Sequence, residues 1–218
     1  MNTARLAEQN SLVDQLVRHI HDSIVFGEMA PGAHISVREI ANTYGVSMIP
    51  VREALARLGA SRLLTSEKNR GYFVAEPPSK DEFQEFLEAR ALFETSVVRL
   101  GFENVNEKDL ELLRDLNAQM HDLFSGPDEQ SIIIEWSSLN VRFHQVLVGL
   151  ARNFYLSEQY SDMSFGNTHL QLMRAYPHTP DNLKKLVNEH DELITALEAG
   201  EKEHFLDMLS NHVTRVVV

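Results

Sequence analysis

Apolar positions in the first third of the chain follow helical spacing and then give way to a strand pattern. Ser36 and Glu39 have the spacing of an N-terminal capping box. Gly45 supplies the left-handed backbone that a tight turn between two helices requires. The pattern predicts three helices and a two-stranded hairpin, over about residues 11–26, 36–44, 47–58, 63–67 and 72–74.

A proline-containing linker, residues 75–79, separates this region from a second one that is helical throughout. Ser79 and Glu82 form another capping box at its start. Further helices are expected over about 79–100, 106–124, 129–150, 154–174, 180–199 and 201–216. We expect a mainly α protein with two domains, residues 1–76 with a small β-wing and residues 77–218 as an all-α antiparallel bundle.

The charge of the chain is unevenly distributed between these two regions. The net charge is −12, but residues 1–76 hold eight Lys/Arg and eight Asp/Glu, so the excess acid lies in residues 77–218. A neutral domain binds nucleic acid when its basic groups share one face. The 218 residues include no cysteine, which excludes disulfides and thiolate metal sites. We see no signal peptide and no apolar run long enough to span a membrane, so we expect a cytoplasmic protein without a membrane partner.

Helix, tight turn, second helix and hairpin form the layout of a winged helix-turn-helix, in which the start of the third helix enters the DNA major groove. The apolar face of that helix (Val51, Leu55 and Leu58) would point to the core. Its exposed start would then face DNA with Ser47, Met48, Ile49 and Arg52.

Two further contact points fit this layout. Arg38 begins the second helix, and Arg70 with Gly71 forms the tip of the wing. Arg52 suits guanine O6/N7 or a phosphate, and Arg70 suits the minor groove or a phosphate. A single arginine of this kind is more often a solvated surface group, but three at the contact points of one layout favour a DNA-binding face.

The segments that carry this layout resemble regulators of the GntR type. They read VREIA at 37–41, GVSMIPVREAL at 45–55 and RGYFV at 70–74, and the helical remainder resembles the FadR-type C-terminal (FCD) domain. The resemblance implies a homodimer, more often a repressor than an activator, on a pseudo-palindromic operator and switched by a small ligand. Met48 and Ile49 replace an Arg and a Thr of the family, so its operator preference does not carry over. Arg62 replaces a helix-closing Gly, and Gly59 predicts that the third helix ends early.

Three histidines lie on apolar helix faces of the second region, and Asn140 lies one turn before the first of them. A single such histidine is usually a hydrogen-bonded core residue. Three on three helices, His144, His190 and His212, favour a convergent site, and neutral imidazoles suit zinc or nickel. The resemblance implies the same set, because metal-binding members use Asp-x3-His followed by one His on each of the last two helices. Asn140 replaces that Asp, so the site either holds metal more weakly or contacts the effector directly.

The resemblance also suggests effector contacts. Arg90 lies in a segment similar to the R-x-x-L/F-E of the family, where the Arg clamps an acid, although pairing with Glu94 is an equal alternative. Asn153 matches a position near the family pocket, or caps the next helix. His169 and Arg174 are weaker candidates.

These features favour a transcription regulator that binds operator DNA and a small carboxylate effector, with a divalent metal in its sensor domain. One alternative is a DNA-binding protein whose helical region only dimerises, but inward-facing His and Asn are costly without partners. Another is a metal-dependent enzyme. The chain has no HExxH, G-x-S-x-G or P-loop motif, so we expect no catalytic activity.

Overall fold

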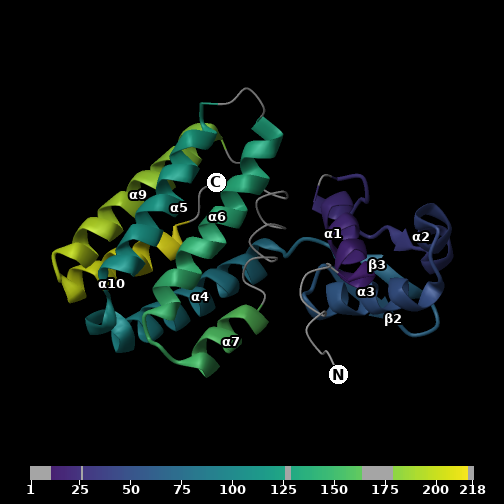
Figure 1. Ribbon diagram of the computed structural model, residues 1–218, viewed down its shortest axis with the longest axis horizontal. Helices are drawn as coiled ribbons and strands as arrows, with labels where there is room; N and C mark the ends of the chain where they lie inside the picture. The colour runs from purple at the N-terminus through teal and green to yellow at the C-terminus, as the bar shows by residue number, and fades with distance from the viewer. Residues whose placement is uncertain (1–10, 26, 126–128, 164–178, 216–218) are drawn as a thin grey trace, which may run out of the picture. The chain divides into compact units, whose positions relative to one another are not determined.

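The computed structural model describes residues 11–25, 27–125, 129–163 and 179–215. Internal contacts divide the chain into two compact units, Met1–Pro77 and Pro78–Val218. Each unit has its own hydrophobic core, and each is described by itself (Figure 1).

The first unit packs three helices against a small sheet. Its elements are α1 (Leu12–Val25), β1 (His34–Ile35), α2 (Val37–Tyr44), α3 (Met48–Ala60), β2 (Leu64–Glu67) and β3 (Gly71–Val74). The apolar faces of α1 and α3 meet in the core, where the most deeply buried side chains include Leu16, Ile20, Val51, Leu55 and Leu58. The expected core face of the third helix is confirmed.

The turn between α2 and α3 has the conformation that the sequence predicts. The Ser36 hydroxyl accepts a hydrogen bond from the Glu39 backbone N–H at 3.2 Å, which caps the start of α2. Gly45 ends α2 with φ of 64°. This is a left-handed conformation that strains residues with a Cβ. The turn positions the start of α3 on the surface of the unit.

The sheet has three antiparallel strands in the order β1-β3-β2, one more than the sequence predicts. His34 pairs with Phe73, and Leu64 pairs with Val74. The extra strand β1 has two residues. That is too few for an alternating pattern to reveal.

The end of α3 differs from the expectation of an early stop. The helix continues through Gly59 to Ala60. Arg62 then takes φ of 61°, and the backbone N–H of Leu63 reaches back to the carbonyl of Leu58 at 3.1 Å. This is a Schellman-type end that normally uses Gly, so Arg62 occupies a left-handed position despite its side chain.

The second unit is an antiparallel helical bundle. Its elements are α4 (Lys80–Gly101), the 3-10 turn η1 (Phe102–Asn104), α5 (Glu107–Leu123), α6 (Glu129–Gly149), α7 (Phe154–Asp162), α9 (Pro180–Glu198) and α10 (Lys202–Thr214). Helix α5 packs on α6 and α9, and α10 packs on α4 and α9. The expected fold, a winged helix-turn-helix followed by a helical bundle, is confirmed.

One expected helix is shorter than the sequence suggests. The helical pattern over 154–174 predicts a single helix, but α7 ends at Asp162, and the backbone N–H of Met163 caps the carbonyls of Gln159 and Ser161. Ser161 and Asp162 have side chains that compete with helical hydrogen bonds, which favours an end at this point. Residues 164–178, with His169 and Arg174, lie outside the described residues. Within the described parts of the chain, no helix has both the length and the apolar character needed to cross a membrane.

Candidate functional site

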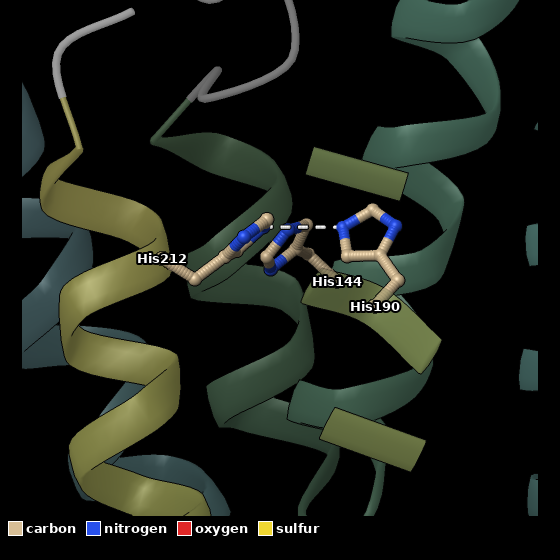
Figure 2. Close-up of side chains that lie close together, drawn as sticks. All are labelled: His144, His190 and His212. Carbon is tan, nitrogen blue, oxygen red and sulfur yellow. Dashed lines mark hydrogen bonds between the residues drawn. The ribbon is translucent and has the colours of Figure 1, made fainter. Parts of the chain in front are cut away.

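Three histidines from three helices meet in the core of the second unit. His144 lies on α6, His190 on α9 and His212 on α10, and all three are buried. One nitrogen from each ring lies within 4.8 Å of the others. Figure 2 shows the three rings converging. Nε2 of His190 lies 3.1 Å from Nε2 of His212. The expected convergence of the three predicted histidines is therefore present.

The outer nitrogen of two of these rings faces a carboxylate. Nδ1 of His144 lies 2.7 Å from Oε2 of Glu94, and Nδ1 of His212 lies 2.8 Å from Oε2 of Glu189. Ionised carboxylates only accept hydrogen bonds. Each Nδ1 therefore carries a proton and donates it, which leaves the lone pair of a neutral ring on Nε2.

The third ring is held in the same way by an amide. Nδ1 of His190 lies 3.2 Å from Oδ1 of Asn117. The Asn117 amide cannot be reversed, because its Nδ2 donates to the carbonyl of Val187 at 3.2 Å and to Oδ1 of Asp191 at 2.6 Å. Asn117 therefore accepts from His190, and the lone pair of this ring also lies on Nε2.

The centre of the cluster consequently contains hydrogen-bond acceptors that face one another. Nε2 of His144 and Oδ1 of Asn140 are buried without a hydrogen-bond partner in the described structure. The short approach between His190 and His212 requires a cation or an additional proton, because both Nε2 atoms carry lone pairs. Three imidazole nitrogens, with an amide oxygen one helical turn away, are a donor set suited to a divalent transition metal.

Burial keeps two of the rings neutral. Desolvation lowers the pKa of His144 to about 4, with Glu94 partly opposing this shift. Desolvation also lowers the pKa of His190 well below its ordinary value, and the neighbouring histidines add to the effect. Neutral rings at physiological pH are the form that a metal binds.

A buried polar cluster surrounds the carboxylate that contacts His144. Arg90 Nε donates to Oε1 of Glu94 at 2.5 Å, and the Tyr160 hydroxyl donates to the same oxygen at 2.8 Å. Although burial alone would raise the pKa of Glu94, the charge of Arg90 and the hydrogen bonds from His144 and Tyr160 hold it well below its ordinary value. Of the two contacts predicted for Arg90, an acidic effector or Glu94, the structure has the pair with Glu94. This pair is buried in the core of the unit.

The remaining effector candidate that the structure describes is on the surface. Asn153 is exposed, and its Oδ1 accepts from the backbone N–H of Leu156 at 3.3 Å, so it caps α7. This is the second of the two roles expected for it.

Sequence reasoning missed most of the groups that hold the histidines. In the sequence, Glu94 stands out only as the residue four positions after Arg90. Glu189 stands out only as the residue before His190. Asn117 and Tyr160 come from helices that do not carry the histidines, and no spacing in the sequence links them to the cluster. Only the packing of the helices brings these groups together.

The predicted DNA-facing residues of the first unit are all exposed to solvent. Met48 exposes 48% of its surface and Ile49 exposes 77%. Large apolar side chains are more often covered. The Ser47 hydroxyl makes no helix-capping bond. The other exposed members of this set are Arg38, Arg52, Arg70 and Gly71.

The arginines of this unit differ in their contacts. Arg57 pairs with Asp14 and Glu53, at 2.8 and 2.7 Å. Arg38 and Arg52 make no hydrogen bond or ion pair with any residue that the structure describes. These two guanidinium groups are therefore available to phosphates or bases.

The tip of the wing is held by a histidine that the sequence did not single out. Nε2 of His34 lies 3.0 Å from the carbonyl oxygen of Arg70. Gly71 has φ of 94°, and a Cβ there would lie 3.3 Å from the same His34 nitrogen. Arg70 pairs with Glu67, and its guanidinium lies 5.1 Å from the centre of the Phe73 ring. These contacts join the backbone and the side chain of Arg70 to other residues of the wing.

A winged helix-turn-helix joined to a helical bundle with a polar cluster in its core is the architecture of a DNA-binding transcription regulator. The model of the family "Bacterial regulatory proteins, gntR family" matches residues 12–74, and the FCD domain model matches residues 85–215. The chain belongs to the GntR family of regulators, and its helical unit is an FCD domain.

Relatives and solved structures agree with this membership. The Nta operon transcriptional regulator of Aminobacter aminovorans is 31% identical over 173 residues, which cover 79% of this chain and 77% of that protein. The HTH-type transcriptional repressor GlaR of Escherichia coli (strain K12) is 25% identical, with 90% of each chain covered. The structure of E. coli McbR/YncC matches with a TM-score of 0.71 and 25% identity over 93% of each chain. These relatives are transcription regulators and not enzymes.

Proposed function

We propose that this regulator senses a small carboxylate through a divalent metal, zinc or nickel, held by the three core histidines. The observation that carries the proposal is the arrangement of His144, His190 and His212, in which each Nδ1 is held by an acceptor and each Nε2 points inward. Asn140 would add an oxygen ligand. When bound, the metal supplies a Lewis-acidic centre with positions left for an effector.

The balance of charge around the cluster favours an acidic effector. Glu94 is already paired with Arg90, and Glu189 is paired with Arg215. The three imidazoles and the Asn140 amide are neutral ligands, so a bound divalent ion would keep its full charge. Because uncompensated charge in a protein core is costly, an anionic ligand such as the carboxylate of an organic acid would complete the site.

The DNA-reading role is assigned to the exposed start of α3. Arg52 would contact a base edge or phosphate, with Ser47, Met48 and Ile49 beside it, and Arg38, Arg70 and Gly71 would hold the flanking backbone. Met48 and Ile49 offer only apolar contact, which suits the methyl group of thymine. The operator should therefore differ from those of relatives that carry polar residues at these two positions.

The protein would act as a homodimer on a pseudo-palindromic operator, with half-sites about one helical turn apart. Leu92 and Leu100, about two turns apart on α4, each expose 71% of their surface. Such exposed apolar side chains suit contact with a second copy. Effector binding would favour one arrangement of the dimer, and operator DNA would alter effector affinity by the same factor. Because the relative GlaR is named a repressor, repression is the favoured mode.

The DNA-binding proposal is tested with a duplex selected from a randomised library by the full-length protein. Arg52→Ala should reduce affinity for the selected duplex by about 5- to 150-fold at physiological salt, because a bidentate base contact contributes about 1–3 kcal/mol. Arg57→Ala is the matched control, since Arg57 lies on the same helix but is paired with Asp14 and Glu53. Equal affinities of Arg52→Ala and wild type would reject this role.

The sensor proposal is tested by thermal shift and by DNA release. Small organic acids are screened with the full-length protein, in the presence of zinc, of nickel or of EDTA. An acid that acts through the metal should raise the melting temperature and change operator affinity only when metal is present. An acid with equal effects in EDTA would show that the metal is not part of the effector site.

A further inference from the structure

We infer that Glu94 is a positioning residue that fixes the tautomer of His144, and that Arg90 and Tyr160 keep Glu94 in that role. The inference rests on the proposed metal site, because its consequence is the availability of His144 Nε2 as a ligand. It assigns to the Arg90 guanidinium a role within the protein core in place of a direct contact with the effector.

The contacts of Glu94 divide its two oxygens between two tasks. Oε1 accepts from Arg90 Nε at 2.5 Å and from the Tyr160 hydroxyl at 2.8 Å. Oε2 lies 2.7 Å from Nδ1 of His144. Glu94 has no exposed surface, so water cannot replace any of these partners.

The donor and acceptor groups of these side chains allow only one direction for the hydrogen bond between His144 and Glu94, from the ring to the carboxylate. A guanidinium only donates, so the atom facing Arg90 must be an acceptor. A carboxylate has acceptors on both sides, so the ring of His144 must donate from Nδ1 and keep its lone pair on Nε2. Because Nε2 of His144 is the atom that points into the cluster, the Arg90–Glu94 pair determines whether this ring can act as a ligand.

The isosteric substitution Glu94→Gln separates this role from a purely structural one. Arg90 would attract the amide oxygen, which turns the NH₂ group toward His144. His144 would then accept at Nδ1 and carry its proton on Nε2, where it cannot bind a metal. The loss of an orienting outer partner typically costs about 10–100-fold in metal affinity, and we expect a loss of that size for zinc.

A second substitution should restore the ligand. In Arg90→Met/Glu94→Gln, the donor that fixes the amide is gone, and the Tyr160 hydroxyl is able to accept from the NH₂ group. The amide oxygen is then free to face His144, and metal binding would select this orientation, so zinc affinity should return to within ~3-fold of wild type. Glu88→Gln is the matched control, because Glu88 is an exposed carboxylate on the same helix.

The tautomer itself is measured by nitrogen-15 NMR of the histidine rings in the metal-free, full-length protein. Wild type should show His144 protonated on Nδ1, and Glu94→Gln should show it protonated on Nε2. A proton on Nε2 in metal-free wild type would overturn the inference, even if Glu94→Gln does not fold. Unchanged zinc affinity in a folded Glu94→Gln variant would also overturn it. Absence of zinc binding by wild type would instead reject the proposed metal site, which the tautomer measurement does not depend on.

Discussion

Replacing Asn140 by Asp adds one negative charge on α6, one turn before His144, without a change in side-chain shape. Asn140 is 2% exposed, and its Oδ1 has no hydrogen-bond partner in the described structure. With metal bound, an Asp carboxylate would be an anionic ligand in place of a neutral one. Without metal, it would be a buried charge among acceptors. Asn140→Asp should therefore strengthen metal binding and weaken the metal-free fold.

The size of the gain follows from two opposing terms. At a separation of about 4 Å and an effective dielectric of about 20, a unit charge and a divalent ion attract by ~8 kcal/mol. A carboxylate in this buried position costs several kcal/mol, and protonation without metal relieves that cost, so the metal must displace the proton and loses that part of the attraction. The difference of a few kcal/mol corresponds to a gain of about 10- to 100-fold in zinc affinity, at ~1.4 kcal/mol per factor of ten.

The assay is a competition with a zinc chelator of known affinity, followed by thermal melts in EDTA and in zinc. Relative to wild type, Asn140→Asp should melt at a lower temperature in EDTA and at a higher one in zinc. Asn211→Asp serves as the control, because Asn211 is an exposed residue of α10. Zinc affinity within threefold of wild type, or equal melting temperatures in both conditions, would refute the assignment of Asn140 to the site.

Three further predictions concern the winged unit. Arg62 has φ of 61°, a conformation that only Gly takes without strain. Arg62→Gly should therefore be more stable than Arg62→Ala by about 1 kcal/mol in urea unfolding, and equal stabilities would contradict this. At Gly71 φ is 94°, and a new Cβ would crowd His34. Gly71→Ala should thus destabilise the wing by about 1–2 kcal/mol, and an unchanged unfolding midpoint would argue against a strained wing tip. Arg38→Ala should lower the slope of log affinity for duplex DNA against log salt by about 1, if Arg38 contacts one phosphate, and an unchanged slope would remove Arg38 from the interface.

Much of the fold follows from local rules that the sequence displays directly. The Ser36 cap, the left-handed Gly45 and the apolar face of α3 each depend only on residues a few positions away in the sequence. The structure confirms each of them. The end of α3 was predicted wrongly. The helix continues through Gly59 despite the low helix propensity of Gly, and Leu58 and Leu63, on either side of the left-handed Arg62, are both buried in the core of this unit.

The histidine cluster could be predicted only in part. Helical periodicity places His144, His190 and His212 on inward faces, and the burial of all three agrees with it. Periodicity does not reveal which groups from other helices contact their outer nitrogens. Glu94 and Asn117 come from α4 and α5, and their contacts depend on how the helices pack.

The central claim is that the three histidines of the FCD domain hold a divalent metal. The most direct test is metal analysis by mass spectrometry of the full-length protein, purified without a His-tag and then supplied with zinc or nickel and desalted. Wild type should retain close to one metal ion per chain, and His190→Ala should retain far less, because His190 supplies a buried ligand nitrogen. A stoichiometry near zero for wild type after addition of either metal would contradict the account.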